Sequence, residues 1–189
     1  MKIRLIATLF VLALVSLAPA FVQAQDTGVE DSLIILTNRP EVGANDSLFI
    51  IEVWIFNDND GVAPQLGFAW DSDALTLDSA VASAEAAAAF NMILFYDTDI
   101  ATSNANDRAI FAGVSFVGGT MAANPNRHLA ATYYFTLSEW TVGSEILVDT
   151  ASWDDGSELL FVPAGDPYIP VYFAGNGAIS VKDPSDVNA

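Results

Sequence analysis

Side chains that could carry out catalysis are scarce in this sequence. It contains one histidine, His128, and no cysteine, so the usual general base and the usual zinc ligands are almost missing. Ser115 lies in Gly-Val-Ser-Phe-Val, which lacks the second glycine of a nucleophile elbow and is predicted to be a strand. His128 follows Asn-Pro-Asn-Arg, a turn entering a strand, which predicts a surface or edge histidine. We therefore predict that the chain is not an enzyme.

Pairs of acidic residues in predicted loops are the second feature with chemical potential. Hard cations such as calcium prefer clustered oxygen ligands, which Asp58 with Asp60 and Asp71 with Asp73 could supply. Neither pair completes an EF-hand loop, and before Asp58 the position of the first ligand is taken by Phe56. The pairs are thus interpreted either as a calcium site or as solvated turns, and no cofactor is certain. With 24 acidic residues in the chain, no pair is singled out for glycoside hydrolysis.

Aromatic residues are the third feature. Exposed rings stack on the apolar faces of sugars or anchor a protein partner, whereas buried rings fill a core. Trp70 is predicted to be core, and Tyr133 points inward by the alternation of its strand. The candidates for a binding role, each with core packing as the alternative, are Trp54, Phe56, Tyr134, Trp140 and Trp153.

The charge balance narrows the range of partners. Six basic residues against 24 acidic ones give a formal net charge of −18 at pH 7. So negative a surface repels phosphate backbones and anionic head groups, which excludes nucleic acid as a partner. The charge fits solubility or a salty habitat, a basic partner, or divalent cations.

The N-terminal segment has the pattern of an export signal. Lys2 and Arg4 precede an apolar run over residues 5–17, and Val22-Gln23-Ala24 forms a small-x-small cleavage site. We therefore expect residues 1–24 to be a signal peptide and the mature protein to be secreted by a bacterium. The run is shorter than the roughly 18 residues of a spanning helix, so membrane insertion is not expected. One domain is predicted over residues 25–182, followed by a short polar tail at 183–189.

The rest of the chain has the pattern of an all-β protein. Short segments rich in Val, Ile, Phe, Tyr and Thr alternate with Asn, Asp, Gly and Pro clusters, which is typical of a single antiparallel β-sandwich such as a jelly roll. One helical segment is expected near residues 83–90, where a serine cap precedes an alanine run. Strands are predicted at residues 32–37, 47–56, 65–70, 75–81, 92–96, 109–117, 129–137, 145–149, 159–162, 168–173 and 178–181.

Alternation within the strands predicts which side chains face the core. The odd positions of residues 129–137 point inward, as do Phe49, Ile51, Val53 and Ile55. The even positions around Trp54 and Phe56 are also largely apolar. Coverage of this second face by the helical segment and loops is the favoured interpretation, and an interaction surface is the alternative.

Four segments resemble the cohesin-type β-sandwich, which is related to carbohydrate-binding-module-like sandwiches. They are the long strand over 46–57 ending at Asn57, the aromatic-Asp corner over 66–81, the strand over 129–137, and the closing Asn-Gly-Ala-Ile-Ser-Val over 176–181. The resemblance implies a module that holds dockerins. The sequence carries no dockerin-type calcium repeat, and cohesin-like domains also occur in bacteria without cellulosomes.

These observations predict a secreted, non-catalytic binding module that recognises another secreted protein, dockerin-like or other, through a sheet face. Two alternatives stay open. One is a carbohydrate-binding module that holds a polysaccharide on exposed aromatic rings, and the other is an extracellular structural subunit that self-associates.

Overall fold

The computed structural model of the chain describes residues 32–37, 41–43, 48–58, 60–70, 75–96, 98–116, 121–137, 145–151, 160–163, 171–174 and 178–182. The expected signal peptide and polar tail lie outside these residues. So do Asp71, Asp73, Trp140 and Trp153.

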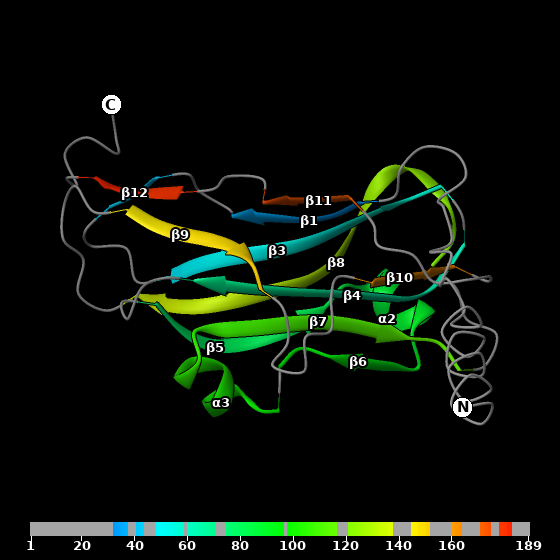
Figure 1. Cartoon of the computed structure of the whole chain (residues 1–189), viewed down its shortest axis with the longest axis horizontal. Coiled ribbons are helices and arrows are strands. Elements are labelled where there is room, and N and C mark those ends of the chain that lie inside the picture. The colour runs from blue at the N-terminus through cyan, green and yellow to red at the C-terminus, as the bar shows by residue number, and fades with distance from the viewer. Residues whose placement is uncertain are drawn as a thin grey trace, which may run out of the picture.

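Two sheets pack face to face, which confirms the predicted β-sandwich (Figure 1). Both sheets are mainly antiparallel, and the pairs β1·β11 and β2·β12 are parallel. The five-stranded sheet has the order β11 (Val171–Ala174), β1 (Ser32–Thr37), β3 (Leu48–Asn57), β8 (Asn124–Leu137) and β5 (Leu75–Ala82). The seven-stranded sheet has the order β2 (Glu41–Gly43), β12 (Ala178–Lys182), β9 (Glu145–Thr150), β4 (Gly61–Trp70), β7 (Arg108–Val114) and β6 (Met92–Leu94), with β10 (Leu160–Pro163) also paired to β4.

The core lies between the sheets, where the alternation of the strands predicts it. The odd positions of β3 are fully buried, and each such aliphatic or aromatic side chain contributes roughly 1.5–3 kcal/mol. Trp70 packs edge-on against Phe135, and Phe68 packs edge-on against Tyr133, with ring centroids 4.9 Å apart in both pairs. Both Trp70 and Tyr133 are core residues, as predicted.

Tyr133 also ties the two sheets together through its hydroxyl. Its Oη donates a hydrogen bond of 2.6 Å to the carbonyl oxygen of Ile110, so a side chain of β8 bonds to the backbone of β7. Burial raises the pKa of the Tyr133 hydroxyl well above its ordinary value, and the nearby Tyr96 adds to the shift. The hydroxyl therefore stays protonated and keeps donating across the core.

A bulge in β8 makes part of the predicted alternation wrong. The register between β3 and β8 shifts at Val53/Trp54, so that Val53 faces Ala131 while Trp54 faces Leu129. As a result Ala130 is fully buried, and Leu129, predicted to point inward, is half-buried beside Trp54 on the outer face. An extra residue on one strand reverses the alternation beyond it.

The predicted helical segment is present as α2 (Ala84–Ala89). Ser83 caps it, because its hydroxyl accepts a hydrogen bond of 3.0 Å from the backbone N–H of Ala86. Ala86 and Ala89 are buried in the core cluster, so α2 helps to close the sandwich. The expectation that this segment covers the outer face of β3 is therefore wrong.

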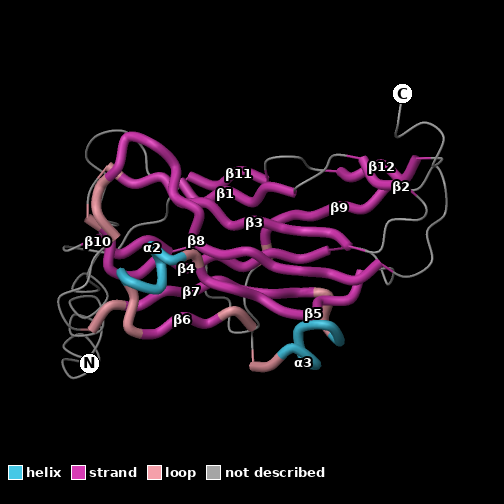
Figure 2. Tube along the Cα trace, turned by 180° about the vertical axis from the view of Figure 1, so that it is seen from behind, coloured by secondary structure: helices cyan, strands magenta, loops and turns pink. Residues whose placement is uncertain are grey.

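A second short helix, α3 (Ile100–Ala105), was not expected from the sequence. Asp99 caps it, and the hydrogen bond from the Thr102 backbone N–H lowers the pKa of that carboxyl. The side-chain amide of Asn104 on α3 bonds to both backbone groups of one residue of β5, Leu77. Its Oδ1 accepts from the Leu77 N–H at 2.7 Å, and its Nδ2 donates to the Leu77 carbonyl at 2.9 Å. Helix α3 thus lies at the outer edge of β5 (Figure 2).

Candidate binding surfaces on the two sheets

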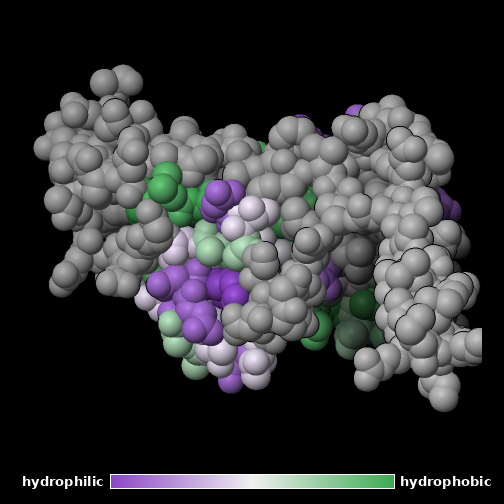
Figure 3. All heavy atoms as spheres, viewed as in Figure 1, coloured by the Kyte–Doolittle hydropathy of each residue, from purple (hydrophilic) through white to green (hydrophobic). Residues whose placement is uncertain are grey.

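The outer face of the seven-stranded sheet is built from small and apolar side chains. Cross-strand partners place Leu94, Ala112 and Gln65 in one row, and Met92 with Val114 in the row beside it. Met92 and Leu94 of β6 are each 39% exposed, and Leu147 of β9 is 49% exposed. Figure 3 shows hydrophobic surface over β9 and again toward β6. Large apolar side chains are thus open to solvent on this face.

Charge is sparse on the described part of this face. Arg108 and Asp149 lie on either side of Ala69 in a single row across β7, β4 and β9. Beyond this row, β4 places Gln65 and Gly67 on this side of the sheet, and β7 places Ile110 and Ala112 there. Of these four residues, Gly67, Ile110 and Ala112 are buried. The chain has 24 acidic residues and a net charge of −18, so a sheet face with so few carboxylates is less acidic than the chain as a whole.

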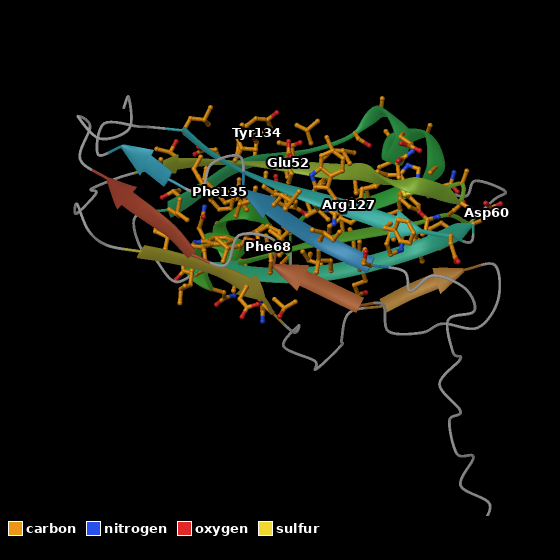
Figure 4. All side chains as sticks on the ribbon, turned by 90° about the horizontal axis from the view of Figure 1, so that it is seen from above. Glu52, Asp60, Phe68, Arg127, Tyr134 and Phe135 are labelled. Atoms are coloured by element: carbon orange, nitrogen blue, oxygen red, sulfur yellow. The ribbon has the colours of Figure 1, made fainter. Side chains whose placement is uncertain are left out.

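The outer face of the five-stranded sheet has a different composition. Glu52, Trp54 and Tyr134 lie on it, all partly buried, and Glu52 Oε2 accepts a hydrogen bond of 3.0 Å from Trp54 Nε1. Figure 4 shows Glu52 and Tyr134 on the outer side of the sheet, while Phe68 and Phe135 lie between the sheets. Rings, hydroxyls and carboxylates are therefore mixed on this face, which carries Thr132, Thr136, Asp78 and Ser79 as well.

The predicted site residues fall into separate groups in the structure. Trp54, Phe56 and Tyr134 share the outer face of the five-stranded sheet. Asp58 and Asp60 lie in the turn from β3 to β4, where Asp60 Oδ1 accepts a hydrogen bond of 2.9 Å from the Ala123 N–H. Among the described residues, no three histidine, aspartate or glutamate side chains form a group suited to a metal ion.

His128 is buried, so the prediction of a surface or edge histidine is wrong. Its side chain is 2% exposed, and Nδ1 lies 2.6 Å from Oε1 of Glu85 on α2. The turn chemistry before it was misleading, because β8 begins at Asn124 and His128 already faces Ile55 within the sheet. The hydroxyl of Ser115 lies 3.5 Å from Asn91 Oδ1. The contact with Glu85 gives His128 a structural role between β8 and α2.

The exposed residues Met92, Leu94 and Leu147 were not singled out from the sequence. Residues 92–96 and 145–149 were predicted as strands, so the alternation of those strands was an available signal. It would have placed Ile93, which packs against the core, opposite to Met92 and Leu94. What the strands do not reveal is that β6 and β9 flank β7 and β4 in one sheet.

No protein-family model matches the sequence, and no curated protein matches it. Solved structures do. The sixth cohesin of scaffoldin B from Acetivibrio cellulolyticus, in complex with a dockerin, gives a TM-score of 0.59 at 14% identity, over 81% of this chain and 99% of that one. The chain has a cohesin-like fold.

Two further structures agree with this cohesin-like assignment. An OlpA cohesin–dockerin complex from Clostridium thermocellum gives a TM-score of 0.60 at 10% identity, over 79% of this chain and 99% of that one. A type III cohesin from a cell-surface anchoring scaffoldin of Ruminococcus flavefaciens gives 0.52 at 17% identity, over 75% and 81%. In the described part of this cohesin-like chain, no helix has the length and hydrophobicity to cross a bilayer.

Proposed function

We propose that this protein is an exported, non-catalytic module that binds a partner protein through the outer face of its seven-stranded sheet. The observation that carries the proposal is the exposure of Met92, Leu94 and Leu147 on a face whose described part carries little charge. Exposed apolar surface of this kind is typical of protein-binding sites.

The distribution of exposed apolar residues supports a macromolecular partner. Gly67 and Ala112 at the centre of β4 and β7 are buried, so the open apolar surface lies to either side of that centre. Larger apolar residues stand on β6 and β9 at either side. A standard protein interface buries about 800 Å² on each partner, an area that a sheet face of several strands can supply.

The similar structures support a protein ligand in a second way. The cohesins from Acetivibrio and Clostridium were solved in complex with dockerins. A partner of the dockerin type, or another secreted protein, fits the same fold here. The leader pattern at residues 1–24 supports export, and the burial of His128, the sequence's one histidine, against Glu85 supports a binding function without catalysis.

Affinity capture followed by titration tests this proposal. The protein is immobilised and exposed to proteins secreted by its own organism, and the captured protein is then purified. Its dissociation constant is measured by calorimetry with wild type, Leu94→Asp and Leu147→Asp. We expect each charge to weaken binding at least tenfold, because truncating or charging a central apolar anchor costs about 2 kcal/mol or more.

The matched control is Val81→Asp. Val81 is 55% exposed on the outer face of the five-stranded sheet, so the same change of charge is made on the opposite face. It should leave the dissociation constant within twofold of wild type. Binding that survives both Leu94→Asp and Leu147→Asp, or that is lost with Val81→Asp, would contradict the proposed face.

A further inference from the structure

The second sheet face has features that the proposed protein-binding function does not use. Along β3 and β8, an aromatic row, a polar row and another aromatic row follow one another. Trp54 lies beside Leu129, then Glu52 beside Thr132, then Ile50 beside Tyr134. Two rings thus flank a carboxylate and a hydroxyl on one side of the sheet.

The orientation of Trp54 is fixed by a hydrogen bond. Side chains two residues apart on a strand lie about 6.8 Å apart on the same face. The indole must therefore lean along β3 to bring Nε1 within 3.0 Å of Glu52 Oε2. A ring that leans along the strand makes a platform on the sheet, and its polar atom is already bonded to the neighbouring row.

Polar groups beside this platform are also held in place. The Thr136 hydroxyl donates a hydrogen bond of 2.6 Å to Asp78 Oδ2, across the β8·β5 pair. The carboxylates of Glu52 and Asp78 each keep a second oxygen that can accept a hydrogen bond from a ligand hydroxyl. Groups fixed before binding lose less entropy when a ligand arrives.

We propose that this face of the five-stranded sheet binds a neutral polysaccharide, with Trp54 and Tyr134 as stacking platforms and Glu52 and Thr132 as the hydrogen-bonding row between them. Aromatic faces beside carboxylate and hydroxyl acceptors are the complement of sugar rings, which are apolar on their faces and carry hydroxyls at their edges.

The negative charge of this face and of the chain favours a neutral glycan over an acidic one. Glu52 and Asp78 lie on the face, and Arg127 is exposed near its Phe56 end, within a chain whose net charge is −18. An acidic polysaccharide is repelled by this charge, whereas a neutral one loses nothing by it.

The distance between the Trp54 and Tyr134 rows favours an oligosaccharide over a single sugar. Ile50, the partner of Tyr134, is four residues from Trp54, which places the backbones of these two rows on the order of 14 Å apart along the strand direction. Three rows of this length extend beyond a single pyranose, so an extended oligosaccharide is the ligand that uses all of them. Because this site lies on the opposite sheet, it does not depend on the proposed protein-binding face.

Affinity electrophoresis tests the inference. The full chain is run through gels that contain soluble neutral glucan, xylan or galactomannan, with polygalacturonate as the polyanionic comparison. We expect at least one neutral glycan to retard wild type and polygalacturonate to have no effect. Calorimetry with hexasaccharides of the retarding glycan should show an association constant that changes less than twofold between 0.05 M and 0.5 M salt.

Variants then locate the site. Trp54→Ala and Tyr134→Ala should each weaken glycan binding at least tenfold, and Glu52→Gln should weaken it several-fold without loss of shape. Trp54→Phe, which keeps a ring, guards against a fold defect in the alanine variant, and circular dichroism checks each protein. Thr76→Ala on the same face and Leu147→Asp on the opposite face should leave glycan binding unchanged.

Three results would overturn the inference. They are no retardation by any neutral glycan, equal retardation by polygalacturonate, and retardation that Trp54→Ala and Tyr134→Ala leave intact. If the captured protein partner, in place of a glycan, loses affinity in Trp54→Ala, this face is a protein interface. Failure of the Leu94→Asp and Leu147→Asp test alone would leave the glycan site standing.

Discussion

The outer faces of the two sheets differ although both back onto the same core. The seven-stranded sheet presents Met92 and Leu94 on β6 and Leu147 on β9. The five-stranded sheet presents Trp54 and Tyr134 among hydroxyls and carboxylates. In a sandwich, alternate residues of each strand point into the core, and the residues between them point outward. The difference shows that one stable core can support two recognition chemistries without either disturbing the other.

Removing a ring from the shared core should give the largest effect. Phe135→Ala leaves a cavity beside Trp70 and Phe49 and should lower the free energy of unfolding by about 3–5 kcal/mol. Urea unfolding measures the loss. Binding through both faces should fall together with the folded fraction, and loss of one face alone would show that the two faces do not share a core.

The bond between the sheets should give the next largest effect. Tyr133→Phe removes the hydroxyl that donates to the Ile110 carbonyl and should cost about 1–2 kcal/mol in urea unfolding. The hydroxyl also predicts a pH dependence. Its pKa is higher in the folded state than the ordinary value of about 10, so its contribution is complete below pH 10 and is lost as the pH rises further.

The matched measurement follows unfolding of wild type and Tyr133→Phe from pH 8 to pH 11. Wild type should lose more stability than the variant above pH 10. Parallel curves would mean that the Tyr133 hydroxyl does not stay protonated in the folded protein.

The smallest effect on stability should come from replacing exposed apolar residues. These variants also compare the hydrophobicity of the two faces without a ligand. Met92→Ser with Leu94→Ser should change the free energy of unfolding by no more than about 0.5 kcal/mol per site. Retention on a hydrophobic column should shorten clearly, because Met92 and Leu94 are neighbours in one apolar patch. Leu48→Ser with Val81→Ser is the control, since these residues lie apart on β3 and β5. Equal shortening in both double variants would remove the contrast between the faces.

Much of the fold could be predicted from local patterns. β1 begins and ends where predicted, and β3, β5, β9 and β12 differ by a residue or so at their ends, because apolar alternation bounded by turn residues is a local signal. The alternation also placed Tyr133 in the core, and Trp70 was predicted to be core from its position before the aspartate corner. It failed at Leu129, because the bulge in β8 depends on its pairing with β3.

The surfaces were harder to predict because they too depend on which strands pair with one another. Trp54, Phe56 and Tyr134 were identified as candidates from their residue types, and the structure brings them onto one face. The exposed face of the other sheet depends on β6, β7, β4 and β9 lying side by side, which follows from long-range pairing. His128 was misplaced because its partner, Glu85, lies 43 positions earlier on a helix.

Asn104 has a consequence for how copies of this protein behave at high concentration. By accepting from and donating to Leu77, its amide occupies the backbone groups that a sixth strand would need at this edge of β5. The Tyr96 hydroxyl accepts from the Ala80 N–H in the same strand. An incoming strand would have to displace both side chains, so β5 is a poor template for amyloid-like growth.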